Sequence, residues 1–358
     1  MPRVYVREPV PMRFSRPGPH EDLESGRLEA MESRKSISGS EPSLATIELV
    51  GIPIDHGGAG SGQAGGPAAL REAGIATIPG RTVVDLGDLG APILPADRIV
   101  RRGPDPESRR TEWDSLRRIC GELHQRTRSS IERGAIPLAV GGDHTLAAGS
   151  LSGVAAGWCA RHGAVVPEDA PSLGLLWFDA HADLNTPETS PSGNPHGMPA
   201  AALLGHRIAP LDDVVGSCGT FDPRRTVLLG GRELDAGERA RCSTDPDSSL
   251  PFLIEGEAFA NDSPESIAER VLQRLAPDGD AFALSFDLDI VDPSEAPGIN
   301  LPSDDGLSVE QVMRVLERLA AHGGCIAMDI VELDPTRDID HRTARIGVDA
   351  ARVMFGSR

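Results

Sequence analysis

Three segments of the chain combine carboxylate and imidazole side chains, and each follows a run of apolar residues. They read Gly-Gly-Asp-His at 141–144, Phe-Asp-Ala-His-Ala-Asp at 178–183 and Ser-Phe-Asp-Leu-Asp at 285–289. The side chains in them that could bind a metal ion are His144, Asp179, His181, Asp183, Asp287 and Asp289. Two imidazoles and four carboxylates are a suitable ligand set for a paired-metal site.

The apolar runs before these segments predict where the ligands lie. Residues 135–140, 173–177 and 281–284 are short and apolar, as expected of buried strands. The carboxyl ends of the strands in an open α/β sheet share one edge, and such sheets place their sites there. Asp179, His181 and Asp183 alternate in sequence, so on an extended strand end we expect them to face one way. The sequence therefore predicts one cluster at one edge of a sheet.

The ligand types favour a particular kind of metal ion. Carboxylate-rich sites without cysteine suit Mn²⁺ better than Zn²⁺, although the order of affinities alone would favour zinc. Four carboxylates would over-neutralise a single divalent ion, so we expect two ions. Two ions roughly 3.5–4 Å apart can share a water molecule and lower its pKa, which yields hydroxide near neutral pH.

Each motif alone has a simpler explanation. An Asp after a strand often caps a helix, and a single His is usually a packing residue. Three motifs with the same placement are harder to explain in this way. Without a cation, four carboxylates at one edge would also repel each other at considerable cost.

The rest of the chain predicts an α/β fold. From residue 46 onward, short apolar runs alternate with segments of helical pattern, which implies a mostly parallel sheet covered on both faces. The strand-like runs are 47–54, 82–86, 135–140, 173–178, 226–229, 281–286 and 325–330, and the helix-like runs are 68–73, 111–133, 146–161, 198–204, 267–275 and 309–322. Residues 1–44 are polar with little periodicity, which predicts a disordered or loosely docked extension. We expect residues 45–358 to form one catalytic domain.

Charge and cysteine content limit the partners and the compartment. The chain has 35 basic and 54 acidic residues and a net charge of −19, which argues against nucleic acid and anionic membranes as partners. The five cysteines are scattered without C-x-x-C spacing, so we expect neither a disulfide framework nor a thiolate zinc site. No apolar run reaches membrane-spanning length. These features predict a cytoplasmic protein.

The ordered set of motifs resembles the ureohydrolase family, and arginases most closely. The resemblance runs from Gly51 to Phe355, and its main segments are 141–145, 179–187, 192–199 and 285–293. It implies a three-layer α/β/α fold of the arginase type and two Mn²⁺ ions per subunit. It also implies hydrolysis of a guanidino or formimino group of a small molecule, and assembly into a homotrimer or homohexamer.

The resemblance assigns roles to individual residues. The six candidate ligands match the six manganese ligands of the family. His196 matches the residue that carries protons to the leaving amine, Glu332 matches the carboxylate that holds the guanidinium, and we expect Asp183 to relay the proton of the hydroxide. An imidazole titrates near neutral pH, and a carboxylate pairs directionally with a guanidinium, so both assignments make chemical sense. The simpler alternatives are a loop histidine bonded to backbone and a solvated acid.

Two further segments resemble the parts of arginases that recognise an amino-acid substrate. Residues 185–194 are similar to the loop that binds the α-carboxylate, and residues 231–238 are similar to the segment whose acids face the α-amino group. The residues that correspond to these contacts are Asn185, Ser190, Ser192, Asn194, Asp235 and Glu238. This part of the resemblance favours L-arginine, hydrolysed to ornithine and urea, over agmatine, which has no carboxylate.

Two departures leave the substrate open. Residues 297–302 read Pro-Gly-Ile-Asn-Leu-Pro where arginases usually have a Thr-Gly-Thr-Pro run, and Leu301 cannot supply a hydroxyl. Residues 333–335 read Leu-Asp-Pro instead of Val-Asn-Pro, and residues 338–345 are as similar to formiminoglutamases as to arginases. The alternatives are formiminoglutamase, guanidinobutyrase and agmatinase, in that order.

The sequence also permits two readings from other protein classes. Residues 60–65 fit the dinucleotide-binding pattern G-x-G-x-x-G, but residues 55–59 separate them from the preceding strand, and Gly66-Pro67 follow them. A non-catalytic family member is the other possibility, but such chains typically lose ligands or the proton carrier, and this sequence keeps them all.

Overall fold

The computed structural model describes residues 45–58, 62–90 and 110–357. These residues form a single sheet of eight parallel strands in the order β2-β1-β3-β8-β7-β4-β5-β6. The predicted α/β fold with a parallel sheet is confirmed. The strands are β1 (Ile47–Ile52), β2 (Val83–Asp88), β3 (Ile136–Gly141), β4 (Leu173–Phe178), β5 (Thr226–Leu229), β6 (Phe252–Ile254), β7 (Ala281–Asp287) and β8 (Cys325–Val331).

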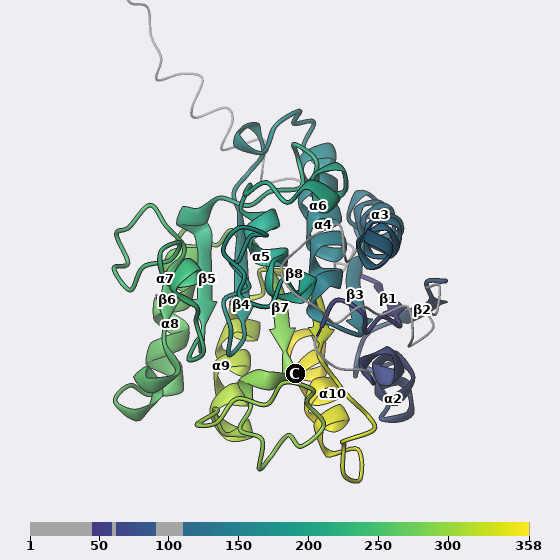
Figure 1. The fold of residues 1–358 in the computed structure, drawn as a ribbon, viewed down its shortest axis with the longest axis vertical. Helices are drawn as coiled ribbons and strands as arrows, with labels where there is room; N and C mark the ends of the chain where they lie inside the picture. Colours follow the sequence, from purple (N-terminus) through teal and green to yellow (C-terminus); the bar gives the residue numbers. More distant parts are fainter. Residues whose placement is uncertain (1–44, 59–61, 91–109, 358) are drawn as a thin grey trace, which may run out of the picture. The chain divides into compact units, whose positions relative to one another are not determined.

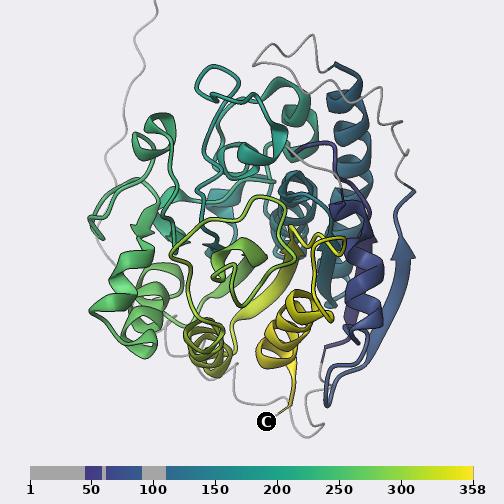
Figure 2. The same cartoon turned by 60° about the horizontal axis from the view of Figure 1, so that its bottom comes forward.

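Helices cover both faces of this sheet and complete three layers (Figure 1). One face carries α2 (Gly66–Glu72), α8 (Pro264–Leu275), α9 (Val309–His322) and α10 (Arg342–Phe355). These four helices lie side by side in Figure 2. The other face carries α3 (Arg110–Glu132), α4 (Ala147–Arg161), α5 (Pro199–Leu203) and α6 (Ala209–Val215).

The strands read as continuous apolar runs because both of their faces are buried. Along β4, Leu176 and Phe178 pack into the core beneath α8 and α9, whereas Leu175 and Trp177 pack into the core beneath α3 and α4. This alternation is the two-residue period of a strand. Polar side chains are therefore expected mainly where the strands end.

Most predicted elements are confirmed to within a few residues, but β6, α6, α7 (Ala236–Arg239) and α10 were missed. Strand β6 has only three residues and lies at the edge of the sheet, so its pattern is too short to recognise. Helix α10 lacks a local capping side chain, because His341 precedes it in a left-handed conformation. The carboxylate of Asp338 instead accepts from the backbone N–H groups of Thr343 and Ala344. Because Asp338 lies several residues before the helix, a search for a capping residue directly before the helix does not find it.

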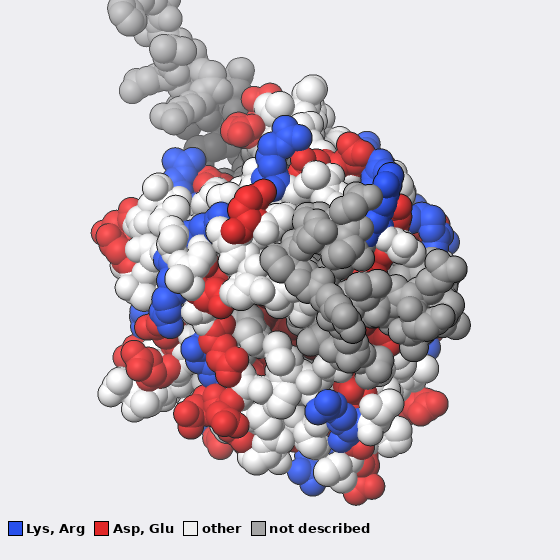
Figure 3. Space-filling view, viewed as in Figure 1, with Lys and Arg blue, Asp and Glu red and all other residues white. Residues whose placement is uncertain are grey.

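Two other predictions concern the ends and the surface of the chain. The predicted extension over residues 1–44 lies outside the described residues. Within the described ranges, no helix is both long and apolar enough to cross a membrane. On the face seen in Figure 3, basic side chains lie singly or in small groups among acidic ones and form no continuous basic surface.

Candidate active site

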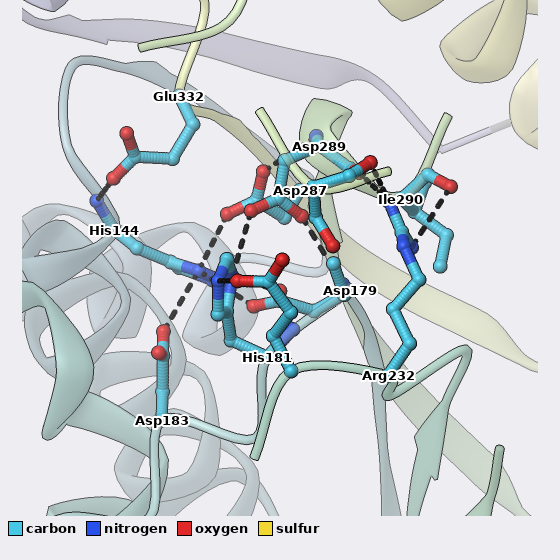
Figure 4. Close-up of polar contacts among 12 residues, drawn as sticks. His144, Asp179, His181, Asp183, Arg232, Asp287, Asp289, Ile290 and Glu332 are labelled. Atoms are coloured by element: carbon cyan, nitrogen blue, oxygen red, sulfur yellow. Dashed lines mark hydrogen bonds and ion pairs between the residues drawn. The ribbon is translucent and has the colours of Figure 1, made fainter. Parts of the chain in front are cut away.

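Four adjacent strands in the middle of the sheet supply the candidate site. The order β3-β8-β7-β4 places their carboxyl ends next to each other. His144 follows β3, Glu332 follows β8, Asp287 ends β7, and Asp179 follows β4. The three motifs therefore meet at one edge of the sheet, as predicted. Figure 4 shows their side chains turned toward one another.

The same local turn follows three of these strands. Asp143, Asp179 and Asp287 each accept a hydrogen bond from the backbone N–H two residues further on, at 3.1, 2.6 and 2.8 Å. Such Asx turns bend the chain sharply. The expectation of an extended strand end over 179–183 is therefore wrong, because β4 stops at Phe178 and Asp183 has φ of 50°. Asp143 and Asp287 thereby cap short 3-10 helices, and Asp179 and Asp287 also lie in the clusters of candidate ligands.

A first cluster surrounds the Nδ1 atom of His144. Carboxylate oxygens of Asp179, Asp183 and Asp287 lie 3.1, 3.0 and 3.0 Å from it. All four side chains are buried. Carboxylates from the ends of β4 and β7 thus surround the imidazole that follows β3, and the ligand atoms of His144, Asp179 and Asp183 all lie within 4.8 Å of one another.

A second cluster is built around His181. Its Nδ1 lies 2.8 Å from Asp289 Oδ2 and 3.5 Å from Asp179 Oδ1. Asp179 turns its other oxygen to His144, so this carboxylate faces both clusters. Each cluster has the side chains to hold one ion, and Asp179 is placed to bridge them.

The residues of this edge fit divalent metal ions. Although three carboxylate oxygens lie close to it, the buried Nδ1 of His144 has no hydrogen-bond partner in suitable geometry. Two ligands at right angles, each about 2.1 Å from one ion, are about 3.0 Å apart, which is the spacing found here. Ligand atoms whose lone pairs face one shared position, and that form no hydrogen bonds with each other, are arranged as they would be around a bound ion.

The electrostatics of the clusters point the same way. Burial, followed by the neighbouring Asp179 charge, raises the pKa of Asp183 to about 6. Burial and the charges of Asp289 and Asp179 raise the pKa of Asp287 well above its usual value. These shifts reflect the cost of gathering carboxylates away from water, a cost that bound cations relieve.

Several supporting residues were missed by the sequence analysis. His144 Nε2 lies 2.8 Å from Ser285 Oγ, and Ser285 donates in turn to Asp329, which also accepts from Ser150. Trp177 stacks on the His144 ring at 4.2 Å and donates from Nε1 to Asp179 Oδ2. Partners of this kind fix the orientation of metal-binding side chains. The sequence does contain a signal for two of them, since Ser285 and Asp329 are polar residues within apolar, buried strands, at positions that pair in the sheet.

Arg232 is another supporting residue that the motifs did not reveal. Its guanidinium donates to the backbone carbonyls of Asp289 and Ile290 at 2.7 and 3.3 Å, as Figure 4 shows. It also donates to the carbonyls of Ser303 and Asp304. Arg232 thereby ties the turn that carries Asp289 to the neighbouring loop.

The two predicted catalytic residues His196 and Glu332 contact each other. His196 Nδ1 lies 3.2 Å from Glu332 Oε1, which also accepts from the backbone N–H of His144 at 2.8 Å. Glu332 is only 4% exposed, so it is not a solvated acid. It also has φ of 66°, and a strained backbone of this kind is concentrated at functional sites.

The pKa values of this pair shift in opposite directions. Burial opposes protonation of His196, but the hydrogen bond to Glu332 and the negative charges of Glu332, Asp183 and Asp143 together raise the pKa of the imidazole. Burial alone would raise the pKa of Glu332, but hydrogen bonds from His196, Gln63 and the His144 backbone lower it. An ionised carboxylate beside a protonatable imidazole can bind a cation and supply a proton.

These side chains line a cavity of about 360 Å³. Its walls include the predicted substrate residues Asn185, Ser190, Ser192, Asp235 and Glu238, together with Leu301. Asn194 lies at its margin, where its backbone N–H donates to Ser192 Oγ. A larger depression of about 630 Å³ lies between α3 and α6, but its arginines are paired, as Arg117 is with Asp213.

The rim of the cavity is internally hydrogen-bonded. Asn185 donates to Asp235 at 2.9 Å, and Thr189 donates to Asn185 at 3.0 Å. Glu238 accepts from the backbone N–H groups of Asp235 and Leu184, and burial raises its pKa to about 7. Asp235 and Glu238 are therefore parts of an ordered wall.

The described part of the glycine-rich segment, residues 62–66, packs closely against the site. Residues 59–61 lie outside the described residues, but a Cβ at Gly62 would lie 2.3 Å from Asp334 Oδ1, and one at Gly66 would lie 2.4 Å from the Gly141 carbonyl. These glycines thus permit close packing. Gln63, in the same segment, donates to Glu332 and is a site residue that the motifs did not indicate.

Comparison with known proteins agrees with this site. The sequence matches the Arginase family over residues 45–356. The arginase of Bacillus caldovelox is 33% identical over 316 residues, which cover 88% of this chain and 99% of that protein. The arginase of Bacillus subtilis (strain 168) is 33% identical over 319 residues, covering 87% of this chain and 98% of that protein.

A solved structure supports the same assignment. The structure of the arginase from Bacillus caldovelox superposes with a TM-score of 0.74 at 31% identity, over 88% of this chain and 99% of that chain. Fold, sequence and the two His/Asp clusters agree, and the predicted resemblance is confirmed. The chain belongs to the arginase family and is a hydrolase acting on linear amidines.

Proposed function

We propose that this enzyme hydrolyses L-arginine to L-ornithine and urea, with two Mn²⁺ ions as its cofactor. The observation that carries this proposal is one cavity that joins both His/Asp clusters, a buried carboxylate for a guanidinium, and a rim of hydroxyl and amide groups. The relatives named arginase in Bacillus species give further support.

The metal ions would be held by His144, Asp179, Asp183 and Asp287 on one side and by His181, Asp179 and Asp289 on the other. The other oxygen of Asp287 accepts from the backbone N–H of Asp289 at 2.8 Å, which links the ligands of the two clusters. When bound, such a pair lowers the pKa of a shared water molecule and so supplies hydroxide near neutral pH. The carboxylate-rich ligand set, free of cysteine, supports Mn²⁺ over Zn²⁺.

The residues of the chain would perform the remaining steps. Glu332 pairs with the guanidinium and holds its central carbon toward the metal ligands. After hydroxide has added to that carbon, Asp183 takes the proton of the added hydroxyl group and relays it. His196 donates a proton to the substrate Nε as the bond from the central carbon to Nε breaks. The products are urea and the amino group of ornithine, so water is the only co-reactant.

The rim supports an amino-acid substrate. Ser190, Ser192 and Asn194 offer hydroxyl and amide donors to an α-carboxylate, while Asp235 and Glu238 offer carboxylates to an α-amino group. Leu301, which is 41% exposed and lines the cavity, supports the alternative of formiminoglutamate or a guanidino acid such as 4-guanidinobutyrate. Agmatine is the least favoured, because it has no carboxylate.

A substrate panel tests the proposal. Metal-stripped protein is reloaded with Mn²⁺ and assayed for urea release from L-arginine, agmatine and 4-guanidinobutyrate, and for formamide release from formiminoglutamate. We expect the highest kcat/KM with L-arginine. Turnover of another substrate while arginine stays inert would replace the proposed substrate and retain the reaction class.

Assembly and compartment form a second part of the proposal. The family resemblance suggests a homotrimer or homohexamer, and the charge and cysteine content suggest the cytoplasm. Sedimentation of the Mn²⁺-loaded full chain measures the assembly, and a species of one or two chains would contradict it. Fractionation of the source cells tests the compartment.

A further inference from the structure

The carboxylate of Glu332 is held on both of its oxygens. Oε1 accepts from the backbone N–H of His144 and lies beside His196 Nδ1, at 2.8 and 3.2 Å. Oε2 accepts from Gln63 Nε2 at 2.9 Å. Gln63 is 1% exposed and Glu332 is 4% exposed, so water does not compete strongly for this bond.

Asn300 fixes the orientation of the Gln63 amide. Its Nδ2 donates to Gln63 Oε1 at 3.2 Å and lies 3.4 Å from Asp334 Oδ2. With its oxygen bonded to Asn300, Gln63 must turn its NH₂ group toward Glu332. A reversed amide would place oxygen against the carboxylate and nitrogen against the Asn300 donor. Asn300 thus donates both to Asp334 and to Gln63, and Gln63 donates in turn to Glu332.

The backbone holds the three contributing segments together. Ile299 forms an antiparallel bridge with Leu333, and the N–H of Asp334 donates to the carbonyl of Gly298 at 2.8 Å. Gly62 has φ of 135° and lies so close to Asp334 that a side chain there would collide with it. Because these segments interlock, Gln63 and Asn300 are preorganised behind the cavity wall.

We propose that Gln63 and Asn300 are positioning residues that aim Glu332 at the amidine cation of the substrate and set how that cation binds. A carboxylate has about four acceptor positions, of which three are occupied here, two on Oε1 and one on Oε2. The free position on Oε2 receives one N–H of a guanidino or formimino group. This inference deepens the proposed function and rests on it. Asn300 lies in the 297–302 run, which departs from the usual arginase pattern.

The first test removes the donor without changing the volume much. Gln63→Leu should lower kcat/KM for the best substrate of the panel by about 10- to 100-fold, the loss typical of one hydrogen bond to a charged group. The loss should appear mainly in KM, and Mn²⁺ content should be unchanged. Gln273→Leu, at an exposed position of α8, is the matched control and should behave as wild type. An unchanged KM, or a loss explained by missing metal, would overturn the proposal.

The second test asks whether Asn300 acts through Gln63. Asn300→Ala should raise KM in the wild-type background and have little further effect in Gln63→Leu, because coupled residues are not additive. Asn300→Asp has the same shape but only accepts, so the Gln63 amide would reverse and turn its oxygen toward Glu332. This variant should therefore lose more than Asn300→Ala. Additive losses, or an Asn300→Asp variant equal to wild type, would contradict the chain of contacts.

A binding measurement separates this inference from the proposed function. Calorimetric titration of the Mn²⁺-loaded proteins with guanidinium chloride needs no turnover. If wild type hydrolyses none of the substrates, the proposed function fails, yet weaker guanidinium binding by Gln63→Leu than by wild type would still support the positioning role. Equal affinities for guanidinium would overturn it.

Discussion

The floor and the rim of the cavity are built differently. The floor consists of the six candidate ligands and their supports Trp177, Ser285 and Asp329, all at or near the ends of central strands and, His181 excepted, buried. The rim consists of residues 185–194, 233–238 and 298–301, which lie in loops and short helical turns. In the floor, lone pairs converge on points between side chains. In the rim, side chains such as Asn185 and Asp235 already bond to each other.

Because of this difference, the floor should determine the class of reaction and the rim should determine which substrate is preferred. A floor of convergent carboxylates and imidazoles sets a class of chemistry, because only cations satisfy it. Rim groups that already bond to each other must exchange those bonds for bonds to a substrate, so each rim contact contributes less. Changes in the floor should therefore abolish activity, and changes in the rim should adjust which substrate is preferred.

The largest effect is expected from Asp179, which faces both clusters. Asp179→Asn should remove the shared ligand and lower kcat/KM by more than about 10³-fold, with loss of bound Mn²⁺. Elemental analysis and urea release measure both effects. The exposed Asp213→Asn is the control and should keep metal and activity. A fully metal-loaded, active Asp179→Asn protein would contradict the distinction between an essential floor and an adjustable rim.

His196 lies between floor and rim, and its replacement should separate chemistry from metal binding. His196→Asn should lower kcat by about 10²- to 10⁴-fold, the usual contribution of a general acid, while Mn²⁺ content and substrate affinity stay near wild type. The exposed His206→Asn serves as the control. Full activity of the His196 variant would remove its role as proton carrier.

Glu238 should give the rim a measurable pH dependence in metal-free protein. Its folded pKa of about 7 lies above the ordinary value of 4.5, so the folded state binds the proton more tightly than the unfolded state. The resulting stability is complete below pH 4.5 and is lost as pH rises to 7, by about 3 kcal/mol in total. Urea unfolding of wild type should therefore show this loss, whereas Glu238→Gln should have a flatter profile.

The control for that experiment is Glu257→Gln, which changes an exposed acid in the segment between β6 and α8. Its profile should run parallel to wild type. If the pH profile of Glu238→Gln were also parallel to that of wild type, burial of the ionised Glu238 would not destabilise the folded state.

Asp329 tests the supports of the floor. Asp329→Asn should weaken Mn²⁺ binding by about 10- to 100-fold, because the chain through Ser285 no longer ends in a charge that orients His144. Competition with a chelator measures the affinity. Ser150→Ala removes only the second donor to Asp329 and should have a smaller effect. Unchanged affinity in Asp329→Asn would show that packing alone orients His144.

The smallest effect is expected from the rim residue Ser192. Ser192→Ala should raise KM for L-arginine by about 2- to 10-fold, the cost of one hydrogen bond at a partly wet site. KM for agmatine should not change, since agmatine lacks the carboxylate. Equal changes for both substrates would argue against a carboxylate contact.

The floor could be predicted from sequence and much of its surroundings could not. Its ligands lie within a few residues of buried strands, so strand prediction and parallel topology suffice to bring His144, Asp179 and Asp287 together. Ser285 and Asp329 were missed because each is a single polar residue in an apolar strand, and only their register makes them partners. Gln63 and Asn300 are 237 residues apart, and no local pattern records their contact.

The boundaries of the elements show the same limit. The apolar run over 173–178 gave β4 accurately, but the Asx turn at Asp179 ended it before the expected extended segment. Helix α10 depends on the distant cap of Asp338. Sequence thus predicts what is local and periodic, whereas contacts between distant loops require the structure.

The most direct test of the central claim is a titration of the metal-free chain with Mn²⁺, followed by electron paramagnetic resonance. If Asp179 bridges the two clusters, two ions should bind per chain, and their spectrum should show magnetic coupling between neighbouring Mn²⁺ ions. A single ion at saturation, or two ions with the spectrum of isolated Mn²⁺, would contradict a shared two-metal floor.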